Sequence, residues 1–171
     1  KGVLDLLDAY SLVSKGASAE FELHFCGDGA ALNEIIGEAA KRSLDHVTFH
    51  GHLSKEEVSM VFERTTMFCV PTRSEFVEGF NKVVAEGLLS GRPVIATTVC
   101  PATNEFQDDV FAVEPNSPSA LAKAITQVVE KYEAGELPLE KTDFPQLTSE
   151  AHSWGAALRK TLNETRQLGY L

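Results

Sequence analysis

The sequence predicts an α/β fold in which a parallel β-sheet is covered by helices on both faces. Two observations predict it. Short apolar runs alternate with segments of helical periodicity over residues 1–132, and such alternation is typical of successive βα units. The chain has 171 residues, of which 43 % are hydrophobic and 23 % charged, which is enough to build the core of one compact domain.

The N-terminal part of the chain is expected to contain two helices and two strands. An apolar stripe at helical spacing over residues 4–13 indicates a helix, and residues 21–25 alternate apolar and polar side chains as a strand does. This strand leads into the turn Gly27-Asp28-Gly29. A helix over residues 31–42 and a short strand over residues 47–49 are expected to follow.

The middle of the chain continues the alternation. Ser54 and Glu57 have the capping-box spacing that begins a helix, which we expect to end near Arg64. Another helix is expected to begin at Ser117-Pro118, because proline suits the first turn of a helix. Apolar strands are expected at residues 67–70, 94–97 and 111–113.

The C-terminal part differs in character. Residues 133–148 are mostly polar, contain two prolines and predict a linker. Residues 149–171 carry Trp154, Leu158 and Leu162 at four-residue spacing, which indicates an amphipathic helix. We therefore expect a domain over residues 1–132, a linker and a separate C-terminal helix.

Residues 78–86, which read EGFNKVVAE, set two carboxylates near the ends of one predicted helix. If this helix begins near Gly79, Glu78 directly precedes its first residue and Glu86 lies about two turns into the helix. The two residues are then roughly 12 Å apart along the helix axis. The free N–H groups of a first turn suit a diphosphate, and a carboxylate suits sugar hydroxyls. The N–H groups concerned are those of Gly79, Phe80, Asn81 and Lys82. The pattern therefore favours a nucleotide sugar.

Spacing alone does not require a ligand. Glu78 is also explained as an acid favoured by the dipole at a helix start, and Glu86 as a solvated residue on an amphipathic helix. The context favours a binding site, because an apolar strand over residues 67–70 precedes the paired acids and a second apolar strand over residues 94–97 follows them.

This run, together with SGRPVIAT at residues 90–97, resembles the signature of retaining glycosyltransferases of the two-Rossmann-domain (GT-B) architecture, above all the large family four. That signature is usually written E-G-F-G, four apolar residues, E-A and later G-x-P-V-I-A. The resemblance extends in order over nearly the whole chain and covers only the C-terminal, donor-binding domain of that architecture. The other matching segments are Lys1-Gly2, FCGDG at 25–29, VTFHG at 47–51, residues 67–72 and HSW at 152–154.

The resemblance implies a Rossmann-like fold and a role for each matching residue. Glu78 corresponds to the glutamate that contacts the donor sugar, Glu86 to the one that contacts ribose, and Lys1 to the lysine that contacts phosphate. The segment around His52 and Leu53 corresponds to the lining of the nucleobase. Catalytic roles thus fall to Glu78 and Lys1, and donor binding to Glu86, Gly79, Phe80, Asn81, Lys82, Gly27, His52 and Leu53.

Two residues depart from the family pattern. Asn81 stands where the family commonly has glycine, and because asparagine tolerates a positive φ we expect the backbone to keep its path there, while the side chain alters the choice of sugar. Gly87 stands where alanine is common. Since glycine inside a helix costs up to about 1 kcal/mol relative to alanine, we expect close packing or local weakness at Gly87.

The resemblance also implies parts beyond this sequence. Lys1 enters a helix directly, whereas an α/β unit should begin with a strand, which is central to the sheet in this architecture. We therefore expect the natural polypeptide to continue upstream with that strand and an acceptor-binding domain, toward which the C-terminal helix packs. This segment alone should bind a nucleotide diphosphate sugar, with UDP or GDP as candidate nucleotides, without turning it over.

Charge and cysteine content limit the partners. The formal net charge of −10 argues against nucleic acid, but a diphosphate needs only helix N–H groups and one or two cations, here Lys1 with Arg73 or Lys82. The three cysteines form no metal spacing and indicate a reducing cytosol. No apolar run has the length of a membrane span. We expect a cytoplasmic protein, with peripheral membrane attachment left to parts not present here.

Several alternatives remain open. Gly27-Asp28-Gly29 resembles a dinucleotide fingerprint but lacks its third glycine, and Asp45 precedes the next strand instead of ending it, so an NAD site ranks low. The pair His50 and His52 is weak support for a metal without a third ligand, and we expect no metal or cofactor. A sugar-nucleotide epimerase or phosphorylase of the same architecture and a nonenzymatic nucleotide-binding module are the other candidates.

Overall fold

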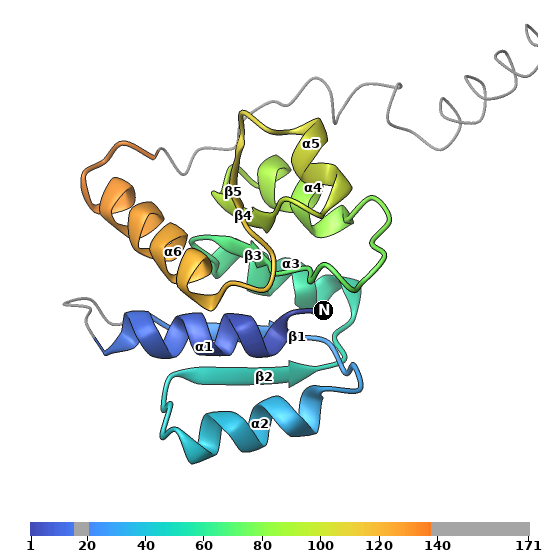
Figure 1. The fold of residues 1–171 in the computed structure, drawn as a ribbon, viewed down its shortest axis with the longest axis vertical. Helices are drawn as coiled ribbons and strands as arrows, with labels where there is room; N and C mark the ends of the chain where they lie inside the picture. The colour runs from blue at the N-terminus through green and yellow to red at the C-terminus, as the bar shows by residue number, and fades with distance from the viewer. Residues whose placement is uncertain (16–20, 138–171) are drawn as a thin grey trace, which may run out of the picture.

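The structure is a computed structural model that describes residues 1–15 and 21–137. Helices and parallel strands alternate along these residues (Figure 1), as the sequence predicts. The expected linker beyond residue 137 and the expected helix over residues 149–171 lie outside the described residues. The elements are α1 (Val3–Ser14), β1 (Leu23–Cys26), α2 (Leu32–Lys41), β2 (Val47–Gly51), α3 (Lys55–Arg64), β3 (Phe68–Val70), α4 (Lys82–Leu89), β4 (Val94–Thr97), α5 (Pro101–Glu105), β5 (Val110–Val113) and α6 (Pro118–Glu133).

The starts of α3 and α6 follow capping residues. Ser54 and Glu57 form the complete capping box at the start of α3, and the side chain of Ser117 caps α6 ahead of Pro118, as expected. Helix α5 was not expected from the sequence, because its five residues are too short to show a period. The signal that could have found it is Pro101 in its first turn.

The described strands form two parallel sheets. Strand β1 pairs with β2, and the second sheet has the order β3-β4-β5. All four residues of the central strand β4 are buried. Its sequence VIAT has the apolar character of a parallel strand that is covered on both faces. The expectation of parallel strands is confirmed, and the expectation of a further strand that is central to the sheet stays a prediction.

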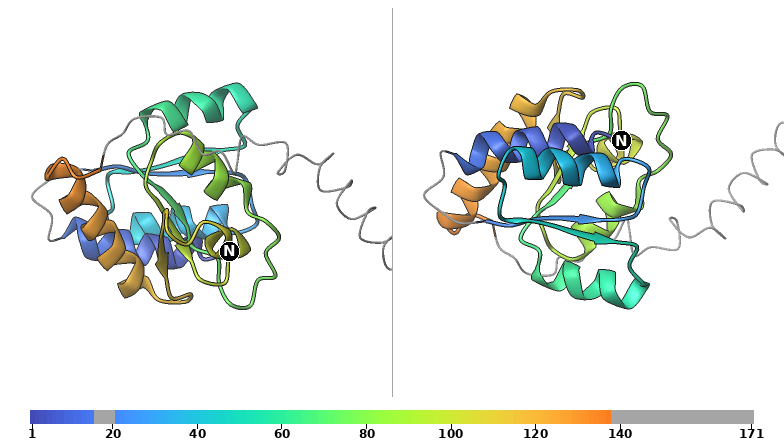
Figure 2. Two further views of the ribbon diagram at one scale, coloured as in Figure 1. Left: turned by 90° about the horizontal axis from the view of Figure 1, so that it is seen from above. Right: turned by 90° about the horizontal axis from the view of Figure 1, so that it is seen from below.

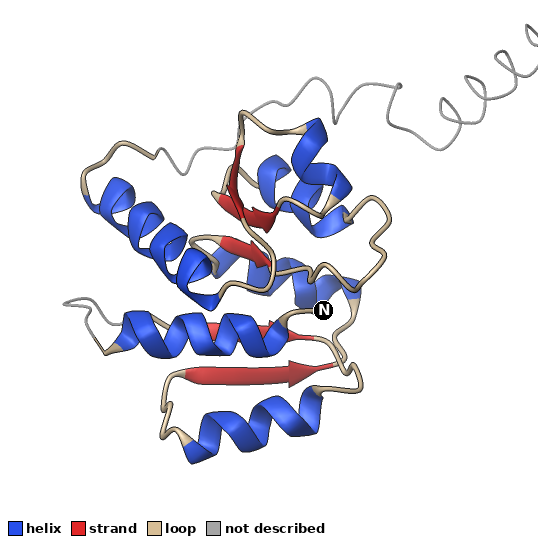
Figure 3. Cartoon of the chain, in the orientation of Figure 1, coloured by secondary structure: helices blue, strands red, loops and turns tan. Residues whose placement is uncertain are grey.

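Helices cover both faces of these sheets (Figure 3). Seen from below, α1 and α2 lie on one side of β1 and β2, and α3 lies on the other (Figure 2). Helices α1 and α6 pack against each other and bury Leu7, Leu121 and Val128 in one apolar core with Ile95 of β4. A second core lies between α4, α5 and the three-stranded sheet. The α/β, Rossmann-like class is thereby confirmed.

Gly87 packs closely against the second core. A Cβ atom at this position would lie 2.7 Å from Val94 Cγ2 and 2.9 Å from Phe68 Cδ2. These separations are below van der Waals contact, so α4 approaches β3 and β4 more closely than alanine would permit. The expectation of close packing at Gly87 is confirmed.

A groove of about 1010 Å³ separates the two sheets, and we call it the β1–β3 groove. Its walls include all of β3, residues 23–26 of β1 and the apolar side chains Val58, Val61 and Phe62 of α3. Within the part of the chain that the structure describes, β1 pairs only with β2 and β3 only with β4. Helix α3 buries none of its ten residues. One edge of each of two parallel strands and one apolar helix face therefore meet in this groove.

None of the helices in the described part is both long and apolar enough to cross a membrane.

Candidate functional site

Glu78 is the centre of a cluster of polar side chains at the carboxyl end of β3. Its Oε2 atom accepts hydrogen bonds from Thr72 Oγ1 at 3.1 Å and from Asn81 Nδ2 at 3.1 Å. Lys1 Nζ lies 3.2 Å from Oε2 and 3.3 Å from Oε1. The side chain of Glu78 is only 10 % exposed, whereas that of Lys1 is 52 % exposed. Residues 77 positions apart in the sequence thus form one ion pair.

Gly2 brings Lys1 to this place. The Gly2 N–H donates to the Pro71 carbonyl at 2.8 Å, just beyond the end of β3. A Cβ atom on residue 2 would lie 2.3 Å from that carbonyl oxygen, so only glycine permits the contact. Lys1 Nζ also lies 5.1 Å from the centroid of the Phe76 ring, a cation–π distance. The Lys1-Gly2 pair therefore has a physical reason: the glycine sets the close approach that places the lysine beside Glu78.

Thr72, which donates a hydrogen bond to Glu78, is the first of three buried threonines that are linked by hydrogen bonds. Thr72 is 1 % exposed and its carbonyl accepts a hydrogen bond from Thr97 Oγ1 at 2.7 Å. The Thr97 carbonyl in turn accepts from Thr103 Oγ1 of α5 at 3.0 Å. Roles for these threonines were not predicted from the sequence. The available signal was a hydroxyl residue at the carboxyl end of each of two apolar strands, Thr97 as the last residue of β4 and Thr72 two residues beyond β3, where buried polar groups need partners.

Helix α4 begins later than expected. It starts at Lys82, and Asn81 is its N-cap, with Oδ1 accepting from the Val83 N–H at 3.0 Å. The expected start near Gly79 is wrong, because asparagine is a strong N-cap and the helix begins after it. Gly79 and Phe80 therefore belong to the preceding loop, and Glu86 lies about one turn into α4 instead of two. Asn81 has a φ of −78°, so the positive φ considered for it does not occur.

The β1–β3 groove brings several of the predicted residues together. Lys1, Leu53, Asn81 and Glu86 line it, with Pro71 and Thr72. Glu78 lies beside it through its contacts with Lys1, Thr72 and Asn81. Glu86 is exposed, so its carboxylate is accessible to a ligand. Four of the predicted residues thus share one concave surface, at the carboxyl ends of parallel strands, where ligands bind in open α/β sheets.

The other predicted residues lie around this groove but do not form its walls. Gly27 directly follows β1, and its N–H donates to the Gly51 carbonyl at 2.7 Å. Gly27 and His52 are exposed. Gly79, Phe80 and Lys82 are exposed in the loop and at the start of α4, and the Phe80 ring contacts that of Phe106 edge-on with a centroid distance of 6.1 Å.

Arg73 is not available as a phosphate ligand in this conformation. Its guanidinium contacts the Asp5 carboxylate at 3.0 Å and the Glu75 carboxylate at 3.3 Å. Burial raises the pKa of Asp5, and the neighbouring Arg73 partly offsets this effect. The cations that remain for a diphosphate are therefore Lys1, which is paired with Glu78, and Lys82 at the helix start.

The histidines of the first sheet contact one another. His24 Nδ1 lies 2.9 Å from His50 Nε2, with the rings stacked, and His24 Nε2 lies 3.0 Å from Glu22 Oε2. Within residues 1–15 and 21–137 no three His, Cys, Asp or Glu side chains are grouped so that they could hold a metal ion. Burial raises the pKa of the Cys69 thiol to about 12, which makes this thiol unreactive at neutral pH.

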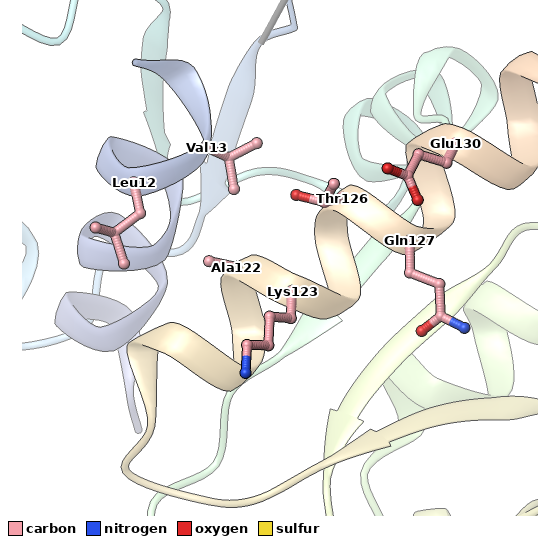
Figure 4. Close-up of a pocket in the computed structure, with 7 residues that line it drawn as sticks. All are labelled: Leu12, Val13, Ala122, Lys123, Thr126, Gln127 and Glu130. Carbon is pink, nitrogen blue, oxygen red and sulfur yellow. The ribbon is translucent and has the colours of Figure 1, made fainter. Parts of the chain in front are cut away.

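A second, smaller pocket lies between α1 and α6. It measures about 290 Å³, and Leu12 and Val13 of α1 line it opposite Ala122 and Thr126 of α6 (Figure 4). It contains none of the residues predicted to bind a ligand. The cluster at Glu78 and the adjoining groove therefore form the better candidate site.

Comparisons with known proteins identify the family of this chain. The profile of the family described as Glycosyl transferases group 1 matches residues 1–140. A relative in Methanocaldococcus jannaschii, named an uncharacterized glycosyltransferase, is 31 % identical over 136 residues, which are 78 % of this chain and 36 % of that relative. The chain spans about a third of the length of the curated relatives that it matches, 36 % and 33 %.

Solved structures show the same fold. The structure of Anabaena HepE in complex with UDP and glucose is similar with a TM-score of 0.72 and 18 % identity, over 98 % of this chain and 45 % of that one. The C-terminal domain of LpcC, a group 1 glycosyl transferase family protein from Francisella tularensis, is similar with a TM-score of 0.69 and 18 % identity, over 94 % of this chain and 78 % of that one. The family expected from residues 78–97 is confirmed by the matching profile. This chain therefore belongs to the family of group 1 glycosyl transferases.

Proposed function

We propose that this chain is the donor-binding domain of a retaining glycosyltransferase, which transfers a sugar from a nucleotide diphosphate sugar to an acceptor. The observation that carries the proposal is the Lys1–Glu78 ion pair, with Nζ 3.2 Å from Oε2, in a cluster beside a groove that Glu86 lines. These are the three charged residues that the family signature assigns to donor binding. The name of the HepE structure, which is a complex with UDP and glucose, supports a donor of this class.

Each residue has a role in the proposed complex. Glu78 accepts hydrogen bonds from the sugar hydroxyls, and Glu86, exposed in the groove, accepts them from the ribose. Lys1 contacts the diphosphate, with Lys82 and the N-terminal end of α4 on its other side. Gly79, Phe80 and Asn81 connect the two carboxylates. Gly27 follows β1, and His52 and Leu53 follow β2. These residues form the binding site of the nucleobase.

The proposed chemistry is electrostatic. As the bond between the sugar and the diphosphate breaks, negative charge grows on the leaving phosphate, and Lys1 and the dipole of α4 stabilise it. Burial of the Glu78 carboxylate, with only 10 % of its side chain exposed, keeps it in one orientation toward the sugar. The proposal requires no metal and no cofactor. An acceptor and the groups that activate it come from the remainder of the protein through domain closure.

We propose that the remainder includes an acceptor-binding domain and, C-terminal to it, a strand that lies between the edges of β1 and β3 and leaves the end of the groove beside the Glu78 cluster open to the donor. The groove exposes one edge of β1 and one of β3, both parallel to their neighbours, and α3 directs Val61 and Phe62 into it. Lys1 lies at the carboxyl end of β3 because Gly2 bonds to Pro71. A strand leading into α1 would therefore run parallel to both edges and join the two sheets, satisfying their free backbone groups.

Calorimetric titration of the full-length protein with UDP, GDP, ADP and NAD tests the function. We expect one nucleoside diphosphate to bind, and we expect Glu86→Ala to weaken it about tenfold through loss of the ribose contact. Glu130→Ala is the matched control, since Glu130 is an exposed helical glutamate in α6, away from the groove. Binding of NAD alone, or equal binding by wild type and Glu86→Ala, would contradict the proposal.

The same protein separates the transferase from its alternatives. A transferase given a nucleotide sugar and an acceptor forms a glycosylated product and releases the nucleoside diphosphate. An epimerase instead forms an isomeric nucleotide sugar, and a nonenzymatic binding module forms no product. Product analysis of one reaction mixture by mass spectrometry and chromatography distinguishes the three outcomes.

A further inference from the structure

We infer that Asn81, together with Thr72, is a positioning residue that anchors Oε2 of Glu78 and leaves Oε1 for the donor sugar. The inference rests on the proposed function and goes beyond it, because it says which oxygen faces the sugar and which side chains hold it there. The relevant contacts are those of one carboxylate group, whose two oxygens have unequal numbers of partners.

The two oxygens of Glu78 differ in their remaining capacity. Oε2 lies within hydrogen-bond distance of three donors, Thr72 Oγ1, Asn81 Nδ2 and Lys1 Nζ, at 3.1, 3.1 and 3.2 Å. Oε1 has one described donor, Lys1 Nζ at 3.3 Å. Since a carboxylate oxygen has about two lone-pair sites, Oε2 is saturated and Oε1 retains an open site. A sugar hydroxyl that approaches this carboxylate therefore binds at Oε1.

The three donors also differ in how firmly they are held. Asn81 and Thr72 are buried, with 8 % and 1 % of their surfaces exposed. Asn81 is fixed by the hydrogen bond from the Val83 N–H to its Oδ1 at 3.0 Å, and Thr72 by the one from Thr97 Oγ1 to its carbonyl at 2.7 Å. Lys1 is half exposed on a flexible stem. When Lys1 turns to a diphosphate, Asn81 and Thr72 remain as the donors that hold Glu78.

Asparagine is the residue that does both tasks at position 81. Its carbonyl oxygen caps α4 and its NH₂ group donates to Glu78. Aspartate would cap the helix but would place a second carboxylate beside Glu78, serine would cap it without reaching Glu78, and glycine would do neither. Because the family pattern commonly has glycine here, this anchor is a feature of this chain and concerns its choice of sugar.

The test uses the full-length protein and pairs of ligands that differ only in the sugar: UDP-glucose with UDP, and GDP-mannose with GDP. Affinities are measured by calorimetry, and the thermal midpoint is measured for each variant. For Asn81→Ser, which keeps a cap, we expect about a tenfold loss of affinity for the nucleotide sugar, no change for the nucleoside diphosphate, and little change in midpoint. Asn81→Asp should lose more affinity for the nucleotide sugar, because its carboxylate repels Glu78.

Thr72 provides a second, independent set of variants. Thr72→Val removes the hydroxyl at nearly constant volume and should also weaken only the nucleotide sugar, whereas Thr72→Ser keeps the hydroxyl and should restore the affinity. A merely structural role would lower the midpoint and weaken both members of a ligand pair alike, and that result would overturn the inference. So would unchanged affinities in Asn81→Ser and Thr72→Val.

The outcomes also separate this inference from the proposed function. The wild type is expected to bind its nucleotide sugar more tightly than the nucleoside diphosphate. If the variants show the same difference in affinity, the inference about Asn81 and Thr72 is refuted and the proposed function stands. If the wild type binds none of the four ligands, the proposed donor site fails and the inference fails with it.

Discussion

At the scale of single residues, close contacts at two glycines determine how the candidate site is assembled. Gly2 lets α1 begin against the Pro71 carbonyl, and Lys1 consequently reaches Glu78. Gly87 lets α4, which carries Glu86, lie directly on β3 and β4. Both positions have ordinary negative φ angles, so their need for glycine comes from space and not from backbone conformation.

Gly2→Ala should be destabilising and should also weaken donor binding. The added Cβ would lie 2.3 Å from the Pro71 carbonyl oxygen, so the start of α1 must move and Lys1 must leave Glu78. We expect a loss of about 1–3 kcal/mol in the free energy of unfolding, measured by urea denaturation. Gly29→Ala is the control, because a Cβ there meets no atom within 4 Å. Equal stability of the two variants would show that the Gly2 contact is dispensable.

The residues that carry charge could be predicted from the sequence, but their supports could not. Glu78, Glu86 and Lys1 were recognised by their order in a motif. Thr72 was not, because its importance comes from contacts with Thr97 and Glu78, which lie 25 and 6 positions away. Such contacts depend on strand order and helix placement, and local spacing does not contain them.

At the scale of elements, helix α4 shows how packing can outweigh helix propensity. Alanine is the better helix former by up to about 1 kcal/mol, but at position 87 it would collide with Val94 and Phe68. We therefore expect Gly87→Ala to lower the free energy of unfolding by about 1–2 kcal/mol. Gly37→Ala in α2, where a Cβ meets no atom within 4 Å, should raise it by about 0.5–1 kcal/mol.

Urea denaturation of both variants measures these two changes under identical conditions. If Gly87→Ala were also stabilising, the approach of α4 to β3 and β4 would be looser than described here. The pair thus tests the placement of Glu86 without any ligand, because Glu86 lies on the same helix.

The contribution of the capping box at the start of α3 to the free energy of unfolding should depend on pH. The Ser54 N–H donates to the Glu57 carboxylate at 2.7 Å, and this hydrogen bond holds the pKa of Glu57 below its ordinary value of 4.5. A carboxylate whose pKa falls on folding stabilises the folded state above its unfolded pKa, and this contribution is lost as the pH falls through the folded value. The difference in free energy of unfolding between wild type and Glu57→Gln should therefore be larger at pH 7 than at pH 3.

Denaturant titrations at the two pH values check this difference, with Glu56→Gln in the same turn as the control. A difference between wild type and Glu57→Gln that stays constant between pH 7 and pH 3 would mean that the capping box does not persist in solution. The helix starts at Ser54 and Ser117 were predictable because a cap is a local pattern. The start of α4 differs from the expected one because the N-cap Asn81, and not the first residue of the motif, sets the helix boundary.

At the scale of the whole molecule, the described strands form two separate sheets, and the sequence predicts a further strand that is central to the sheet. Alternation along the chain predicts parallel strands, but it does not show which strands are neighbours. The β1–β3 groove has the open strand edges and the apolar α3 wall that a further parallel strand needs. The expectation of such a strand stays a prediction, and the groove supplies its physical reason.

Extending the chain by the residues encoded directly upstream of Lys1 should therefore stabilise it. A strand in the groove buries apolar surface on β1, β3 and α3 and completes their hydrogen bonds. We expect a higher thermal midpoint for the extended chain, and slower amide hydrogen exchange in β1 and β3. The same extension with a proline at the centre of the added strand is the control, because it lacks one donor. Equal midpoints for all three chains would show that the groove has another occupant.

The most direct test of the central claim, that Glu78 and its neighbours form a glycosyl donor site, is the rate of nucleoside diphosphate release by the full-length protein. UDP-glucose, GDP-mannose and ADP-glucose are each offered to the wild type, Glu78→Gln and the control Glu130→Gln, with water as the acceptor of the sugar, so that hydrolysis of the donor releases the nucleoside diphosphate. We expect the wild type and the control to release one nucleoside diphosphate at equal rates, and Glu78→Gln to release it about 100-fold more slowly. Release at the wild-type rate by Glu78→Gln would contradict the claim.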